Sequence, residues 1–285
     1  MHGLGRRIVV TGLAAMVAVL RTGRVGASPA LSDIEAYRDA FQAIPPRSPA
    51  QRPLDRVEAA AMAASNRERT AQQAAALPED AILTAIARFY AQALADGAPF
   101  SHTDAQGRQA GERVALLHRR LVGVTAENLY GASLFNPAQA EKAGTEAVRH
   151  LMGSPGHRRN LLDTRWTHAG MGAALGRTGL VIVQLFTARA GLLLTEMPLV
   201  LTAGTPVPTG CQQAAAGGFD GVALVPAGRN PQASDFTSPG MLATPTEAGL
   251  YQAFYAHADQ EMTNESGRSV IFSLHPGPLV QVTAP

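Results

Sequence analysis

The spacing of apolar residues predicts helices in the first half of the chain. Apolar side chains recur three and four positions apart from Ile82 until Gly97 ends the element, and Pro78 suits a first helical position. A stretch rich in helix formers precedes this element, with small residues along one side. The expected helices cover residues 34–43, 54–75, 78–97 and 114–121.

Two further helix starts follow each other closely. Asn136 is expected as an N-cap, with Pro137 in the first turn and Gln139 as an acceptor at the third position. In "SPGHRRNLL", Ser154 is expected to cap a second helix and His157 falls in its first turn. The positive end of the helix dipole there should favour a neutral imidazole.

The pattern changes to strands in the second half of the chain. Residues 169–175 and 180–188 flank the turn "GRTG" and predict a β-hairpin, so helices followed by strands indicate an α+β unit. Beyond Gly191, short strand-like runs are separated by Gly, Pro, Asn and Asp. The Glu-x-Gly-x-Tyr spacing that ends at Tyr251 is typical of a tyrosine corner. We therefore expect a small all-β module, an immunoglobulin-like sandwich.

The N-terminus is typical of an export signal. Arg6 and Arg7 precede the apolar run "IVVTGLAAMVAVL", and small residues suit cleavage after Ala27. The paired arginines leave both the general secretory route and the twin-arginine route open, and an uncleaved anchor is the alternative. The expected organisation is a signal peptide at 1–27, a Pro-rich arm or linker at 28–53, an α+β domain at 54–190 and a β-sandwich-like domain at 191–285.

Removal of the signal changes the charge balance. The chain has 24 basic and 22 acidic side chains, and residues 1–27 hold four arginines and no acid, which leaves a net charge of −2. No basic run with interleaved aromatics occurs, so nucleic-acid binding is not expected, nor is a membrane span after signal removal. Cys211 is the only cysteine, so no intrachain disulfide can form. We expect a small buried side chain there rather than a nucleophile.

Four motifs carry a family resemblance. The segments "FSHTDAQGRQAGERV", "AENLYGAS", "SPGHRRNLL" and "VIVQLFTA" occur in this order between about Leu54 and Ala188. Together they resemble the bacterial branch of the CAP superfamily, the SCP-like extracellular proteins, which are related to plant pathogenesis-related proteins, venom allergens and cysteine-rich secretory proteins. The resemblance implies a three-layer α-β-α sandwich around a small antiparallel sheet.

The resemblance also implies a site. His102, Glu127 and His157 match the family's cleft residues, and Asn128 follows the acid as a positioning residue whose amide binds backbone. Ser154 stands near the place of the second glutamate of many eukaryotic members, so this cleft is expected to carry one acid fewer.

Two imidazoles and a carboxylate are a legitimate ligand set for zinc or another divalent metal, with a fourth position open to water. Spacings of 25 and 30 residues do not show by themselves that the three converge, and a hydrogen-bonded structural cluster is an equal alternative. The chain has no Gly-x-Ser-x-Gly, His-Glu-x-x-His, Walker A or Gly-x-Gly-x-x-Gly motif in the required context.

These observations predict an exported protein of the periplasm or the extracellular space. Its CAP-type domain is expected to bind a small ligand, a lipid or a cell-envelope component, and its C-terminal module to support attachment to a cell-surface partner. The alternative is a metal-dependent hydrolase or peptidase that uses the same three residues, and a third possibility is a purely structural envelope protein.

Overall fold

The computed structural model describes residues 31–213, 218–264 and 267–285. The expected signal peptide and its cleavage position lie outside these ranges. The chain divides into two compact units. The α/β unit comprises Tyr37–His118 and Val124–Arg189, and the β unit comprises residues 31–36, Arg119–Gly123 and the described part of Ala190–Pro285. The division falls inside helix α1 (Leu31–Gln42) and strands β1 (Leu121–Ala132) and β3 (Gly179–Leu193).

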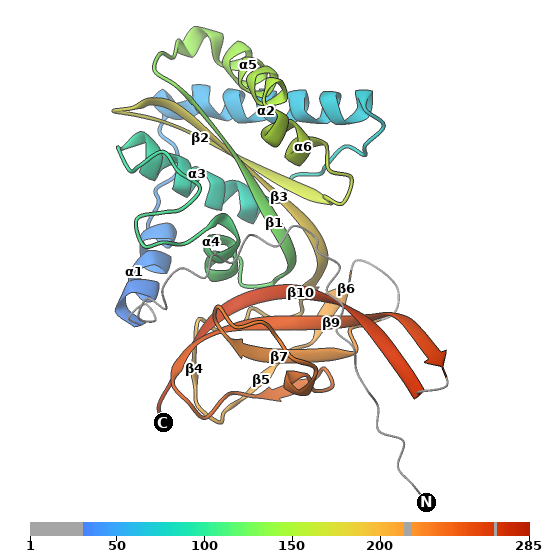
Figure 1. Cartoon of the computed structure of the whole chain (residues 1–285). Coiled ribbons are helices and arrows are strands. Elements are labelled where there is room, and N and C mark those ends of the chain that lie inside the picture. Colours follow the sequence, from blue (N-terminus) through green and yellow to red (C-terminus); the bar gives the residue numbers. More distant parts are fainter. Residues whose placement is uncertain (1–30, 214–217, 265–266) are drawn as a thin grey trace, which may run out of the picture. The chain divides into compact units, whose positions relative to one another are not determined.

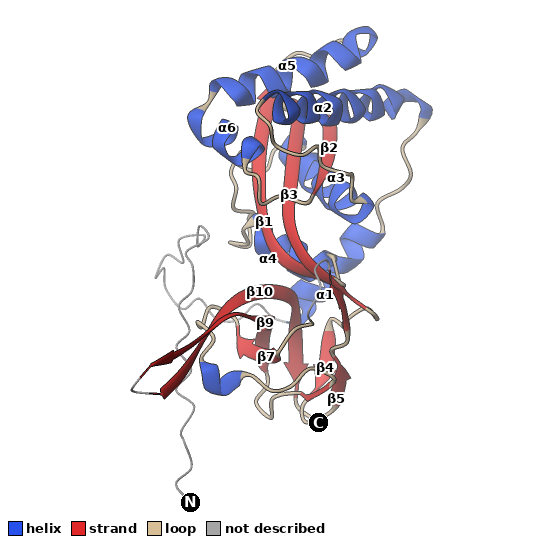
Figure 2. Cartoon of the chain, turned by 90° about the vertical axis from the view of Figure 1, so that its right-hand side faces the viewer, coloured by secondary structure: helices blue, strands red, loops and turns tan. Residues whose placement is uncertain are grey.

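The α/β unit combines helices with an antiparallel sheet. Its helices are α2 (Arg52–Ala71), α3 (Ala81–Ala95), α4 (Ala110–Leu117), α5 (Ala140–Gly153) and α6 (Pro155–Leu162), with single 3-10 turns at Pro49–Gln51 and Pro137–Gln139. Strands β1, β3 and β2 (His168–Gly176) lie in the order β1-β3-β2. Figures 1 and 2 show α2, α5 and α6 on one face of this sheet and α3 and α4 on the other.

The alternation of side chains along β2 explains this layering. Ala169, Met171 and Ala173 point to the layer of α2 and α5, where they join its apolar clusters. The residues between them are glycines, and a Cβ at Gly172 would meet the backbone of α3 at 2.1 Å. Because successive strand residues face opposite sides, the glycines let α3 lie directly against the sheet.

The predicted hairpin is confirmed. β2 and β3 pair antiparallel from His168 with Thr187 to Gly176 with Gly179, so the turn consists of Arg177 and Thr178. The helix predicted over 54–75 is also present as α2, and a helix follows the predicted N-cap Asn136, with a single 3-10 turn before α5.

The predicted start of the third helix was wrong. α3 begins at Ala81 rather than at Pro78, and Asp80 is its N-cap, accepting hydrogen bonds from the backbone N–H groups of Ile82 and Leu83. Pro78 and Asp80 instead form backbone hydrogen bonds with Ala169 of β2. The segment is extended because those bonds use groups that a helix would need for itself.

Buried Glu58 joins the Pro-rich segment to the sheet. Its Oε1 accepts from Arg47 at 2.6 Å and from the backbone N–H of Ala173 at 2.7 Å, and its Oε2 accepts from Arg88 at 2.5 Å. Two guanidinium groups and a backbone donor offset the cost of burying this carboxylate. The segment expected as an arm or linker therefore supplies a side chain to the interior of the α/β unit.

The β unit is built from short strands and one long hairpin. Its strands are β4 (Val200–Thr202), β5 (Pro206–Pro208), β6 (Cys211–Gln213), β7 (Gly221–Pro226), β8 (Met241–Ala243), β9 (Gly249–Asn264) and β10 (Gly267–Thr283). Four of them form a sheet in the order β4-β10-β9-β7, while β5 pairs with β8 and β6 pairs with the end of β3. The short strand-like runs expected beyond Gly191 are thus confirmed as strands, and "GVALVP" is β7.

The predicted tyrosine corner is present, because the Tyr251 hydroxyl donates to the carbonyl oxygen of Glu247 at 3.0 Å. The immunoglobulin-like sandwich as a whole is not confirmed by this topology. Within the described ranges, no helix has both the length and the apolar character needed to cross a bilayer.

We expect Gly172→Ala to destabilise the protein, since its methyl group would enter the backbone of α3. Overpacking of this kind costs about 1–3 kcal/mol, and more where backbone must move. Gly156→Ala on α6 is the matched control, because the added carbon would point into open space, and it should leave stability unchanged or slightly raised. Urea unfolding measures both; equal midpoints for the two variants would contradict the close packing of α3 on β2.

Candidate functional site

His102 lies on the loop between α3 and α4, and buried polar contacts give this loop its shape. Asp104 accepts hydrogen bonds from the backbone N–H groups of Gln106 and Arg108, and its carboxylate also pairs with the Arg108 side chain at 2.8 Å. Gly107 has φ +84°, which a residue with a Cβ rarely adopts. Asp104 and Gly107 are thus the residues that form the turn of this loop.

Glu127 is held by a buried arginine. The Glu127 side chain on β1 is 3% exposed, and its Oε2 accepts a hydrogen bond of 2.5 Å from Nη2 of Arg113 on α4, whose side chain is 1% exposed. The face of the guanidinium lies 3.6 Å from the ring centroid of Tyr90 on α3. Charge-assisted hydrogen bonding and stacking together stabilise this buried pair.

The same arginine also holds the loop of His102. Its Nη1 donates to the carbonyl oxygens of His102 at 3.0 Å and Arg108 at 2.8 Å. Next to it, the Tyr90 hydroxyl donates to the carbonyl oxygen of Ser101 at 2.6 Å. Arg113 is therefore bonded to both the carboxylate and the loop that faces it.

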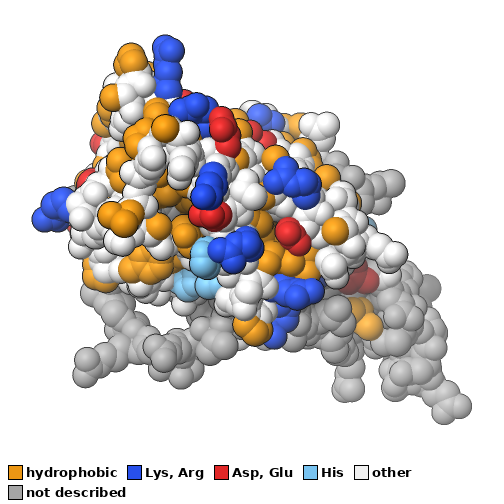
Figure 3. Space-filling view, turned by 90° about the horizontal axis from the view of Figure 1, so that it is seen from above, with side chains coloured by type: hydrophobic (Ala, Val, Ile, Leu, Met, Phe, Trp, Pro, Cys, Tyr) orange, Lys and Arg blue, Asp and Glu red, His pale blue; other side chains and the backbone are white. Residues whose placement is uncertain are grey.

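His102 and Glu127 are in direct contact. Nδ1 of His102 lies 2.9 Å from Oε1 of Glu127, while the His102 side chain is 56% exposed. The carboxylate is thus buried with one oxygen turned to Arg113 and the other to His102, and the imidazole is the part of the pair that reaches solvent. Figure 3 shows histidine side chains at the surface of one face of the molecule, beside basic and acidic groups.

His157 is held beside β1 by a network of amide side chains. Nδ2 of Asn128, the residue after Glu127, donates to the carbonyl oxygen of His157 and to Oε1 of Gln184, each at 3.2 Å. Asn160, one turn after His157 on α6, donates to the Glu127 carbonyl at 3.2 Å and to Asn128 Oδ1 at 3.0 Å. Asn128 thus has a positioning role, and its partner is the backbone of α6.

The start of α6 agrees in part with the prediction. Ser154 occupies the N-cap position, but its side chain makes no capping hydrogen bond, and His157 is in the first turn as expected. Partial burial and the nearby charge of His102 lower the pKa of His157 below its usual value. Both effects favour the neutral form of the His157 imidazole.

The site offers fewer metal ligands than the three that the sequence predicts. Among the residues that the structure describes, no group of three or more His, Cys, Asp or Glu side chains could hold a metal ion. Both oxygens of Glu127 already have partners, in Arg113 and His102. The Glu127 side chain is only 3% exposed, whereas that of His102 is 56% exposed, so the residues present do not offer the expected set of three zinc ligands together.

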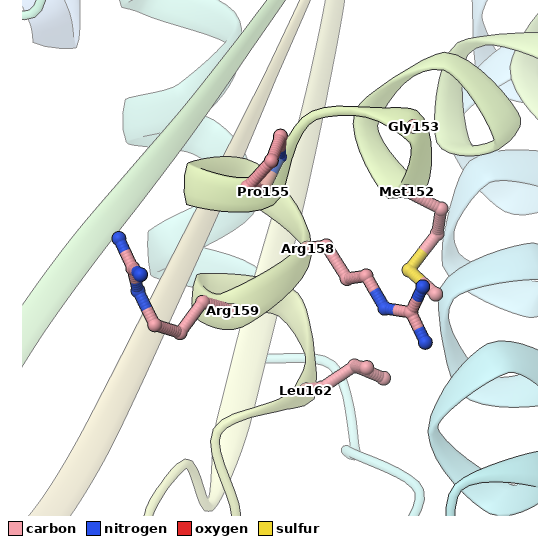
Figure 4. Close-up of a pocket in the computed structure, with 6 residues that line it drawn as sticks. All are labelled: Met152, Gly153, Pro155, Arg158, Arg159 and Leu162. Carbon is pink, nitrogen blue, oxygen red and sulfur yellow. The ribbon is translucent and has the colours of Figure 1, made fainter.

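A surface groove of about 380 Å³ also lies beside α6. Figure 4 shows Arg158 reaching toward Met152 on one side of α6 and Arg159 extending from the other side. The residues that line the groove are Met152, Gly153, Pro155, Arg158, Arg159 and Leu162. None of the three predicted site residues is among them, although His157 belongs to the same helix.

Arg113 is the residue that sequence reasoning missed. Only its position could have revealed it: it lies four residues before Leu117 on a helix whose apolar side is buried, so it shares that side. An arginine on a buried helix face requires a partner, and a carboxylate is the usual one.

Comparison with known proteins places the site in a family domain. The family model described as "CAP: Cysteine-rich secretory protein family" matches residues 62–186. No curated protein matches the chain.

Three solved bacterial structures are similar. An outer surface protein of Borrelia burgdorferi is 21% identical, with a TM-score of 0.37 and coverage of 45% of this chain and 89% of that chain. An extracellular protein with an SCP domain from Bacillus anthracis is 21% identical, with a TM-score of 0.39. That match covers 50% of this chain and 45% of the Bacillus protein. A cysteine-rich secretory protein of Staphylococcus aureus is 19% identical, with a TM-score of 0.33, and the match covers 46% of this chain and 38% of that protein. The match thus spans less than half the length of the last two proteins.

Glu127→Gln should strongly destabilise the protein, because it leaves the Arg113 charge buried without a counter-charge. Breaking a buried pair in this way costs roughly 3–5 kcal/mol. Glu141→Gln is the control, since Glu141 is 67% exposed and lies 3.8 Å from Arg56, and its loss should cost about 0–1 kcal/mol. Chemical unfolding of the two variants measures the difference, and a Glu127 effect as small as that of Glu141 would argue against a buried pair.

Proposed function

Residues 62–186 form a domain of the cysteine-rich secretory protein (CAP) family, and from this premise we propose that the domain binds a small ligand, a lipid or a cell-envelope component at His102. The observation that carries the proposal is the division of roles between His102 and Glu127. The imidazole is exposed, whereas the carboxylate behind it is buried and paired on both oxygens.

Binding is favoured over hydrolysis by the state of Glu127. A carboxylate that activates water needs an oxygen within reach of that water. The Glu127 side chain is only 3% exposed, and its two oxygens face Arg113 and His102, so water has little access to it. A metal-dependent hydrolase or peptidase is therefore the second candidate function. No contact of the three residues favours hydrolysis over binding.

A divalent metal ion such as zinc is a further proposal, limited to the two histidines. The lowered pKa of His157 favours the neutral imidazole that a metal ligand must be. The Nδ1 atom of His102 faces Glu127, so Nε2 is the nitrogen that a metal could reach, with Glu127 behind the ligand rather than on the metal. A bound ion would polarise a ligand oxygen.

We further propose that the protein is exported, with Ser28 as the first residue of the mature chain. The signal-like segment and the family of the domain support this proposal. N-terminal sequencing of protein recovered from the periplasm or the medium should start at Ser28. Recovery of the protein in the cytoplasm alone, with residues 1–27 retained, would contradict export.

His102→Ala should weaken binding of the ligand at least about tenfold, equivalent to about 1.4 kcal/mol. The probes are phospholipid vesicles and soluble cell-wall glycan fragments, with affinity measured by calorimetry on the protein lacking residues 1–27. His168→Ala is the matched control, because His168 lies on β2 of the same unit and its Nδ1 contacts the Thr167 side chain instead. It should bind like the wild type.

The same titration with Zn²⁺ tests the metal proposal and the hydrolase alternative. Zinc affinity that His102→Ala and His157→Ala both abolish would support metal binding, and zinc-dependent cleavage of a peptide or ester probe would favour the hydrolase. Absence of binding to every vesicle and glycan probe, or equal affinity in His102→Ala and the wild type, would overturn the proposed function.

A further inference from the structure

Arg113 makes more specific contacts than a side chain needs if it only fills space in the core. One guanidinium nitrogen, Nη2, binds the Glu127 carboxylate, and the other, Nη1, binds the carbonyl oxygen of His102 itself. The two partners of Arg113 are therefore the two residues that face each other in the proposed site, one contacted through its side chain and the other through its backbone.

In the hydrogen bond between His102 and Glu127, the imidazole is the donor and the carboxylate the acceptor. A carboxylate paired with a guanidinium can only accept hydrogen bonds, so Nδ1 of His102, 2.9 Å from Oε1, must carry the proton. In the neutral ring the lone pair then lies on Nε2. A solvent-exposed histidine prefers the opposite form, with the proton on Nε2, and the His102 ring is more than half exposed.

We propose that Arg113 is a positioning residue that selects the Nδ1–H tautomer of His102 and so presents the Nε2 lone pair to the ligand. Arg113 keeps Glu127 turned toward the ring, and it fixes the backbone from which the ring extends. The inference rests on the proposed function, because it says which atom of His102 meets the ligand: an acceptor that suits a hydroxyl or amide donor.

The contacts of Arg113 fix its guanidinium in one orientation. Its guanidinium is stacked on Tyr90 and is 1% exposed, and its third hydrogen bond goes to the carbonyl oxygen of Arg108 in the same loop. The planar fork of arginine fits two partners at a fixed angle, whereas a lysine ammonium is a single point of charge. A lysine at this position would keep a positive charge next to Glu127 but lose the hydrogen bonds to the carbonyl oxygens of the loop.

The test is the tautomer of His102, read from the ring ¹⁵N shifts at about pH 8, above the usual histidine pKa of about 6.5. The wild type should be mainly the Nδ1–H form, and Arg113→Lys should make the Nε2–H form the major one. This measurement needs no ligand, so it tests the role of Arg113 separately from the proposed function. The tautomer prediction can be wrong while ligand binding is intact, and ligand binding can be absent while the tautomer prediction is right.

Arg69→Lys is the matched control. Arg69 is another fully buried arginine of the α/β unit, and it donates to the carbonyl oxygens of Ala75, Leu161 and Asp163. We expect both lysine variants to unfold at lower temperature, with the tautomer changed only by Arg113→Lys. An unchanged His102 tautomer in a folded Arg113→Lys protein, or the same change in Arg69→Lys, would overturn the proposal.

The wild type alone also provides a decisive measurement, should Arg113→Lys fail to fold. A His102 ring found mainly as Nε2–H in the unmodified protein would contradict the inferred selection outright. A ring found mainly as Nδ1–H, against the preference of an exposed histidine, would support it.

Discussion

The ion pair between Arg113 and Glu127 is the constraint on which the rest of the site depends. Neither charge could be buried alone, because an uncompensated ion in the interior costs several kcal/mol. Since Arg113 is on α4 and Glu127 on β1, the need to pair them joins the helix to the strand. The remaining donors of Arg113 then fix the loop of His102, so one guanidinium sets the geometry of three segments.

The other side of β1 is fixed by amides rather than by charge. Asn128 and Asn160 connect β1 to α6, and Gln184 extends the network to α2 through Ser65. Asn128 and Gln184 each donate and accept, and Asn160 donates to both Glu127 and Asn128, so these polar groups satisfy one another at little cost. Adjacent residues of β1, Glu127 and Asn128, thus hold the two predicted histidines by different means, and both supports are buried.

This division explains which functions the site supports. A carboxylate that is buried, paired and contacted by an imidazole is suited to hold that imidazole still, as second-layer groups do in binding sites. A group engaged in this way is poorly placed to take a proton from water. The proposed role as a binding domain follows from that difference, and the exposed ring of His102 is where a ligand would make contact.

The sequence by itself determined where helices occur, to within a few residues of their ends, together with the β2–β3 hairpin, the tyrosine corner and the family of the domain. Each of these depends on local periodicity, turn chemistry or a motif. Strand β1 escaped prediction, since its two adjacent polar residues, Glu127 and Asn128, are both buried and break the expected alternation. Only the tertiary structure decided that Arg113 is the partner of Glu127. Their pairing joins residues 14 positions apart on different elements, and no local pattern encodes which buried charge meets which.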